Sequence, residues 1–353
     1  MIVLRLPPGP AAPPAVYRLA GELLAADRPL AELEPWRVEA PDAHAIAEEA
    51  VSGDQWCGDD RSAAGWLGEG WVGGVLRQVA CREVAGGYLV AVEGAGRFVV
   101  AADGGAVTWA GREPPPGAAA GDAAAPEPSR RDGGAPASGS PVSAVAAAVL
   151  GPVLALALAL RGTFCLHASA CLLAGSSAPS GPGGDGAVHV FLGESGAGKS
   201  TLARELPRLP GGTWRRLADD VLPVRLAAAG LVALPRFPQL KLATGEQFAR
   251  LARAENRPSL PVTALHVLAG RWDPAAGPSA AAATTPGVVP VEGRAAALAV
   301  AAHTVAARLF PPVLLERHLA FCSAVADGVP VDHLAVPPLP EHAAAVAATL
   351  AQI

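Results

Sequence analysis

The sequence is poor in aromatic side chains and has almost no methionine. Its 353 residues include two Tyr, seven Phe and seven Trp, 5% in all, and a single Met. The hydrophobic share is nevertheless 51%, much of it Ala, so the core must be built mainly from Ala, Val and Leu. Gly (40) and Pro (35) are well above average usage, which predicts long loops or disordered segments. The length suits two domains or one large domain.

Cysteine pairs of the kind that bind zinc are absent. The five cysteines are Cys57, Cys81, Cys165, Cys171 and Cys322, and none stands in a Cys-x-x-Cys pair. An odd number without such spacing argues against a disulfide framework and against a zinc site. We therefore expect buried thiols in a reducing, cytoplasmic environment.

A block of basic residues and a membrane-spanning run are also missing. The net charge of −5 argues against a nucleic-acid partner. Residues 1–8 show no charged lead before a long apolar stretch, so we expect no signal peptide. The most apolar run, residues 144–160, is mostly Ala and contains Gly151 and Pro152. We expect a buried helix, broken at these two residues, and no membrane partner.

Composition divides the chain into three parts. Residues 1–113 predict a small α+β domain, with a β-meander between residues 86 and 109. Residues 114–140 are rich in Ala, Gly, Pro and Ser and predict a disordered linker. Residues 141–353 predict a larger domain of strands that ends in a helical C-terminal part.

Three tryptophans, Trp56, Trp66 and Trp71, fall in one Gly- and Asp-rich segment of the first part. We interpret them as core anchors of a loop-rich domain. The alternative is a peptide-binding surface, because exposed aromatic side chains in loops are effective recognition groups. The N-terminal domain is therefore a candidate for substrate recognition.

Residues 193–200 match the G-x-x-x-x-G-K-[ST] pattern of a P-loop, or Walker A motif. An apolar run over residues 187–192 precedes the loop and a helix-like segment follows it. In that setting, glycines let backbone N–H groups approach a phosphate closely. Lys199 can reach the β- and γ-phosphates, and the Ser200 hydroxyl can bind Mg²⁺. The candidate nucleotide-binding residues are Gly193, Glu194, Ser195, Gly196, Ala197, Gly198, Lys199, Ser200 and Thr201.

Two adjacent carboxylates, Asp219 and Asp220, follow the glycine loop and precede an apolar run. One carboxylate can hold Mg²⁺, and the other can accept the proton of an incoming hydroxyl. The cation would offset their mutual repulsion. We take Asp220, with Ser200, as the candidate Mg²⁺ ligand and both aspartates as candidate catalytic residues. The residues alone leave open which carboxylate is the base.

Three further residues are weaker candidates. His167 stands in one predicted strand, residues 162–173, which we expect to pair as a hairpin with the strand before the glycine loop. Arg236 and Lys241, on an extended segment, could supply positive charge to a transferring phosphoryl group. The remaining histidines show no metal-ligand spacing.

Together these motifs resemble a known family. Residues 166–170 (LHASA), the glycine loop, and residues 217–221 (LADDV) occur in the order found in the kinase domain of HPr kinase/phosphorylase. The chain looks still more like the HPr-kinase-related proteins encoded in ribosomal-peptide gene clusters, including lasso-peptide clusters. The resemblance covers about residues 150–245. It implies an α/β fold, with a P-loop kinase domain related to phosphoenolpyruvate carboxykinase. That domain would have a mostly β core and flanking helices, and a small α+β domain would precede it.

The resemblance also implies a chemistry. It implies ATP and Mg²⁺ as cofactors and a serine or other hydroxyl as acceptor, with His167, Lys199, Asp219 and Asp220 as catalytic residues. Thr201 stands where the HPr enzyme commonly has an acidic residue, and its Gly-rich phosphorylase segment is not found downstream. These differences point away from HPr as the acceptor and from the reverse phosphorylase reaction.

The sequence therefore predicts an ATP-dependent kinase acting on a hydroxyl of a peptide or protein, such as a biosynthetic precursor peptide. Two alternatives stay open: a small-molecule kinase, and a nucleotide-binding regulatory module without transfer activity. The expected partners are a nucleotide and a peptide or protein acceptor, with a homo-oligomer as a further option.

Overall fold

The computed structural model describes residues 1–7, 9, 12–38, 65–72, 75–111, 144–175, 186–239, 259–268, 286–336 and 341–353. The predictions for the linker 114–140, for Trp56, for Cys57 and for Lys241 lie outside these residues. Trp66 and Trp71 belong to a described strand, but their side chains lie outside the description. The chain is an α/β protein with two mixed sheets and few helices.

The N-terminal sheet has eight strands in the order β2-β3-β1-β8-β7-β6-β5-β4. The strands are β1 (Ile2–Arg5), β2 (Ala15–Leu19), β3 (Glu22–Ala26), β4 (Gly65–Val72), β5 (Val75–Val84), β6 (Gly87–Val92), β7 (Gly96–Ala101) and β8 (Ala106–Gly111). A 3₁₀ helix, η1 (Ala31–Trp36), follows β3. β1 runs parallel to both neighbours, and the other pairs are antiparallel. The predicted meander is confirmed as β6, β7 and β8.

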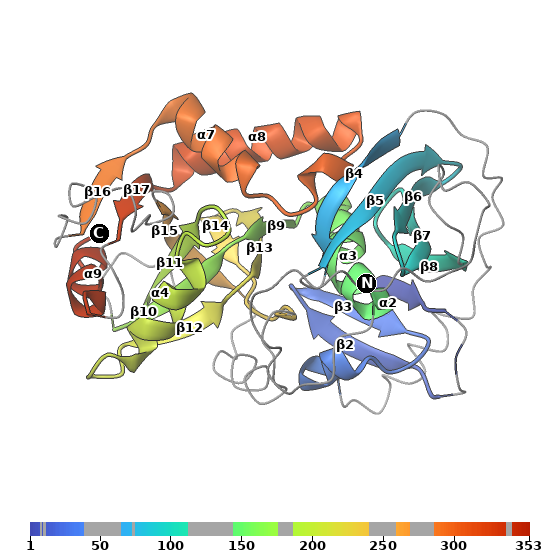
Figure 1. Ribbon diagram of the computed structural model, residues 1–353, viewed down its shortest axis with the longest axis horizontal. Helices are drawn as coiled ribbons and strands as arrows, with labels where there is room; N and C mark the ends of the chain where they lie inside the picture. The colour runs from blue at the N-terminus through green and yellow to red at the C-terminus, as the bar shows by residue number, and fades with distance from the viewer. Residues whose placement is uncertain are drawn as a thin grey trace.

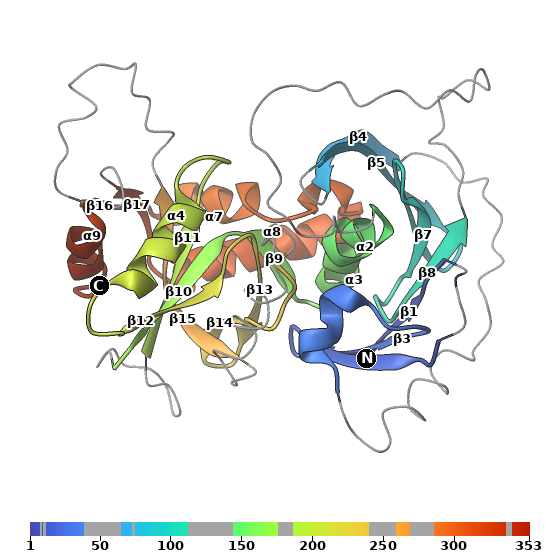
Figure 2. The same cartoon turned by 60° about the horizontal axis from the view of Figure 1, so that its bottom comes forward.

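The Ala-rich run after residue 143 forms one kinked helical segment. It consists of α2 (Ala144–Ala148), a π-helical turn η2 (Val149–Val153) and α3 (Leu154–Leu160). Gly151 has non-helical angles (φ −98°, ψ −110°) beside Pro152, which confirms the predicted break. The segment carries no charge, and most of it is buried, as expected for a helix that is apolar all round. Figure 2 shows the N-terminal sheet curving around it, and it also contacts β9 of the second sheet. No helix in the described part of the chain is long and apolar enough to cross a membrane.

The second sheet carries the glycine loop. Its main path is β12-β10-β11-β15-β14-β13-β9, and β17 pairs with both β15 and β16. The strands are β9 (Phe164–His167), β10 (Ser169–Ala174), β11 (Gly186–Leu192), β12 (Trp214–Ala218), β13 (Val221–Ala227), β14 (Gly230–Ala233), β15 (Leu260–Leu268), β16 (Gly287–Pro290) and β17 (Val331–Ala335). Between β11 and β12 come α4 (Lys199–Glu205) and η3 (Leu206–Arg208).

The single strand predicted over residues 162–173 is wrong, because the chain divides at Ala168. β10 pairs with β11 as the predicted hairpin, whereas β9 pairs with β13 on the far side of the same sheet. Ala168 is fully buried, and its N–H donates to the carbonyl of Asp220 at 3.2 Å. The break therefore moves His167 off the strand next to the glycine loop and places it beside Asp220.

Three helices close the chain: α7 (Gly293–Ala302), α8 (Pro312–Gly328) and α9 (Ala343–Leu350). A short 3₁₀ turn, η4 (Ala307–Leu309), lies between the first two. The predicted helical C-terminal part is confirmed, but β17 interrupts it. α7 and α8 lie side by side over the second sheet, and α9 lies at the opposite end of the molecule from the N-terminal sheet (Figure 1).

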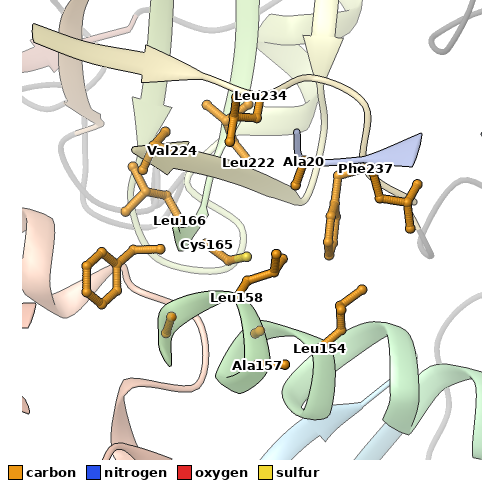
Figure 3. Close-up of a cluster of buried hydrophobic side chains, with 14 of the residues drawn as sticks. Ala20, Leu154, Ala157, Leu158, Cys165, Leu166, Leu222, Val224, Leu234 and Phe237 are labelled. Carbon is orange, nitrogen blue, oxygen red and sulfur yellow. The ribbon is translucent and has the colours of Figure 1, made fainter. Parts of the chain in front are cut away.

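One continuous core joins the two sheets. At its centre, Leu154, Ala157 and Leu158 of α3 face Cys165 and Leu166 of β9 (Figure 3). Leu222, Val224, Leu234 and Phe237 complete the same cluster, together with Ala20 from the β2–β3 turn (Figure 3). The four described cysteines, Cys81, Cys165, Cys171 and Cys322, are buried and free, as predicted. Burial raises the pKa of Cys165 to about 12, so this thiol stays protonated at neutral pH.

Candidate active site

The glycine loop follows a strand that is buried along its whole length. Gly193 has φ +142°, and a Cβ there would lie 3.3 Å from the carbonyl oxygen of Leu268 on β15. Gly196 and Gly198 are left-handed, with φ +87° and +96°. Only glycine adopts these angles without strain. The sequence thus forces a tight turn whose backbone is open to approach by a ligand.

Lys199 is held inside this turn. It is 6% exposed, and its Nζ donates to the carbonyl oxygens of Gly193 at 2.6 Å and Glu194 at 3.0 Å. A buried ammonium group needs such acceptors, and phosphate oxygens are stronger acceptors than neutral carbonyls. An entering phosphate can therefore take over the lysine from the loop.

The acidic pair connects β12 to β13. Asp219 is 7% exposed, and its carboxylate forms an ion pair with Arg216, three residues earlier. The Ser169 hydroxyl donates to the carbonyl of Asp219 at 2.9 Å. The Ser200 hydroxyl of the glycine loop lies 3.4 Å from the same carbonyl. Asp219 therefore lies at the junction of β10, β12 and the glycine loop.

The carboxylate of Asp220 contacts His167. The distance from His167 Nδ1 to Asp220 Oδ1 is 3.3 Å, and the two side chains are 31% and 14% exposed. The pairing of β9 with β13 sets this contact, because His167 stands opposite Val221. A partly exposed imidazole next to a carboxylate can take or give a proton.

His303 is a site residue that sequence reasoning missed. Leu166 forms an isolated bridge with Thr304, and the N–H of His167 donates to the carbonyl of His303 at 2.7 Å. Burial and the positive charge of Lys199 lower the pKa of His303, and the charge of Glu194 partly opposes them. The end of α7 thus brings a second histidine beside the first. His167 and His303 are 136 residues apart in the chain, and no spacing pattern in the sequence indicates that they lie together.

The extended segment after β14 contributes Gln239, which is 2% exposed and binds the backbone of the acidic turn. Arg236 meets the N-terminal domain through its carbonyl, which accepts from the N–H of Ala20 at 2.8 Å. A contact of the Arg236 side chain with phosphate stays a prediction.

A second group of acid and imidazole side chains lies inside the same sheet. His266 Nδ1 is 2.8 Å from Asp332 Oδ1, and His189 Nδ1 is 3.0 Å from His266 Nε2. All three are at most 4% exposed, and Trp214 packs against His189 with ring centroids 5.4 Å apart. Burial lowers the pKa of His189 to about 3. We call these three residues the buried chain.

The oxygen donors at the turn fit Mg²⁺. The Ser200 hydroxyl lies against the acidic turn, and Mg²⁺ prefers hydroxyl, carboxylate and water oxygens. Among the described residues, no group of three His, Cys, Asp or Glu side chains is placed to hold a metal ion.

No family model matches the chain, and no curated protein matches it. Among solved structures, it matches the HPr(Ser) kinase/phosphatase from Coxiella burnetii at 12% identity, with a TM-score of 0.29. The match covers 53% of this chain and 97% of that one. A likeness this low carries no argument about function, so the proposal below depends on the residues of this chain.

Proposed function

We propose that this protein is an ATP-dependent kinase that transfers the γ-phosphate to a serine or other hydroxyl of a peptide or protein. One observation carries the proposal. The glycine loop with Lys199, the acidic turn and His167 are joined by direct contacts, although they come from three separate segments: the Ser200 hydroxyl lies 3.4 Å from the carbonyl of Asp219, and His167 pairs with Asp220. Binding of a nucleotide alone requires only the first of these three.

Residues 193–200 would hold the phosphates of the nucleotide. The loop offers backbone N–H groups where the chain turns left-handed, and Lys199 would exchange its two carbonyl partners for phosphate oxygens. Mg²⁺ would supply positive charge there, which offsets the charge that develops on the phosphates during transfer. The Ser200 hydroxyl and one carboxylate of the turn would hold it.

The contacts support a division of work between the carboxylates that differs from the assignment made on sequence. The carboxylate of Asp219 pairs with Arg216, and the backbone carbonyl of Asp219 lies 3.4 Å from the hydroxyl of Ser200, the other candidate Mg²⁺ ligand. Asp220 faces His167, a group that can carry a proton away. We therefore assign the acceptor hydroxyl to the Asp220–His167 pair, which removes its proton as the phosphoryl group arrives.

The test is phosphate transfer from labelled ATP to a panel of Ser-, Thr- and Tyr-containing peptides, including any peptide encoded beside this gene. Wild-type protein with Mg²⁺ should label a peptide on a hydroxyl. Lys199→Ala should weaken ATP binding and abolish labelling, whereas a surface control, Arg204→Ala, should do neither. The proposal fails if the wild type does not bind ATP, or if Lys199→Ala changes nothing.

Two aspartate variants separate the finer assignments. Asp220→Asn should lower the rate of labelling by about 100-fold or more and leave Mg²⁺-ATP binding intact, whereas Asp219→Asn should raise the Mg²⁺ concentration needed for activity. The reverse result would place Asp220 at the metal. If neither variant alters the protein's output while ATP still binds, the protein is a nucleotide-binding module without transfer. Phosphorylation of a small molecule instead of the peptides would assign a metabolite as acceptor.

A further inference from the structure

We propose that Gln239 is a positioning residue, which fixes both carboxylates of the acidic turn by holding the backbone that carries them. The catalytic consequence of this inference depends on the proposed function. The effect of Gln239 on the backbone of the turn can be measured whether or not the protein is a kinase. Gln239 lies 19 residues after Asp220, in a segment that the sequence marks only as extended.

Both polar atoms of the Gln239 amide have hydrogen-bond partners. Its Oε1 accepts from the N–H groups of Asp219, Asp220 and Val221 at 2.9, 2.9 and 3.3 Å. Its Nε2 donates to the carbonyls of Val221 at 2.8 Å and Phe237 at 3.1 Å. If the amide were flipped, its NH₂ group would face three N–H donors and its oxygen would face two carbonyl acceptors, so all five contacts would be unfavourable. One side chain therefore satisfies three consecutive donors and an acceptor of the same turn.

This arrangement fixes the direction of both aspartates. Three successive N–H groups aimed at one oxygen define a concave backbone, of the kind that otherwise cradles an anion. Here a neutral amide fills it, so the turn keeps its shape without adding charge beside two carboxylates. With the backbone held, Asp219 points to Arg216 and Asp220 points to His167.

Gln239 is itself held from both sides. The segment before it is hydrogen-bonded to β13, through the N–H of Leu234 and the carbonyl of Pro223 at 2.9 Å. Phe237 is buried and points toward Leu154 and Leu158 of α3 (Figure 3). The β2–β3 turn of the N-terminal sheet donates to the carbonyl of Arg236. Because packing locks this segment, the amide is already placed before any substrate arrives.

The first arm of the experiment measures backbone hydrogen exchange. We compare wild type with Gln239→Leu, which removes the acceptor, and with Val90→Ala, in the buried N-terminal core, which leaves all five contacts of Gln239 in place. The amides of Asp219, Asp220 and Val221 should be protected in wild type and Val90→Ala, and should lose protection in Gln239→Leu. Unchanged protection in Gln239→Leu would overturn the inference, whatever the protein's activity.

The second arm measures phosphate transfer. Gln239→Leu should lower kcat by about 100-fold, the effect expected when a catalytic group is displaced by about 1 Å, with KM for Mg²⁺-ATP changed by less than about threefold. Val90→Ala, in the buried N-terminal core, is the control for loss of stability. Assayed below their melting temperatures, Val90→Ala should keep wild-type kcat. A Gln239→Leu kcat equal to that of Val90→Ala would overturn the catalytic consequence. A wild type without transfer would refute the proposed function and leave the exchange result standing.

Discussion

Two groups in the second sheet pair histidine with aspartate, and they differ in access to solvent. His167 and Asp220 lie at the sheet edge, with side chains 31% and 14% exposed. The buried chain His189–His266–Asp332 joins three adjacent strands in the interior. A histidine and an aspartate that reach solvent can exchange protons with a substrate. The same two residue types in the interior can only form hydrogen bonds with each other. Residue type therefore suggests a chemistry, but position in the fold decides whether it is used.

The electrostatics of the two groups differ for the same reason. Burial and the neighbouring His266 lower the pKa of His189 to about 3, so this ring stays neutral throughout the physiological range. His266 Nδ1 lies 2.8 Å from the carboxylate of Asp332, and its Nε2 lies 3.0 Å from His189 Nδ1. His189 Nε2 has no hydrogen-bond partner in the structure. We infer that the buried chain contributes to the stability of the fold. His167 and Asp220, which we call the edge pair, are the group that we propose takes part in catalysis.

The largest expected effect comes from breaking the buried chain. Asp332→Ala should lower the free energy of unfolding by about 3 kcal/mol, because it leaves a buried ring N–H without its acceptor. Urea denaturation measures this. The triple variant His189→Leu, His266→Leu, Asp332→Leu should cost much less, since no polar group remains unpaired. Equal losses in the two variants would show that packing, and not the polar chain, holds this region.

The edge pair should respond in the opposite way. Asp220→Asn should lower the rate of phosphate transfer by about 100-fold or more, as expected for loss of a general base. The side chain is partly exposed, so the melting temperature should change little. Calorimetry and a transfer assay on the same sample check both statements. A large loss of stability would mean that Asp220 is a structural residue like Asp332.

Acid should act on the buried chain. A histidine whose pKa is lowered on folding makes the unfolded state bind more protons, so stability falls as pH drops below the unfolded value of 6.5 toward about 3. Between pH 7 and pH 5 the contribution of His189 is a loss of about 2 kcal/mol. Unfolding at the two pH values measures it. In His189→Leu this part of the pH dependence should disappear, and its persistence would assign it to other groups.

The smallest effect is expected from His303, which lies beside the edge pair without an ion pair of its own among the described contacts. His303→Ala should lower transfer only a few-fold, because its backbone bridge to β9 remains. His303→Gln, which restores a polar side chain, should recover part of the loss. If His303→Ala matches Asp220→Asn in effect, the histidine belongs to the catalytic group itself.

Local features of the site could be read from the sequence because they depend on few neighbours. The glycines of residues 193–200 permit the left-handed angles that the loop adopts, and the strand and helix around them follow from local pattern. The kink at Gly151 and Pro152 was predictable for the same reason.

Other features could not be predicted, because partners distant in sequence create them. The strand over residues 162–173 divides at Ala168 only because its two halves pair with different strands. Gln239 and His303 reach the site through the packing of an extended segment and the end of a helix. The buried chain needs three strands to be adjacent, which no spacing in the sequence reveals.

The sequence by itself determined the glycine loop, the two carboxylates and the apolar helical segment around which the N-terminal sheet curves, since backbone freedom and apolar composition are local properties. The tertiary structure alone decided which histidine meets which aspartate. The two His/Asp groups have similar composition and differ in how far each lies from solvent. Strand order sets that access to solvent.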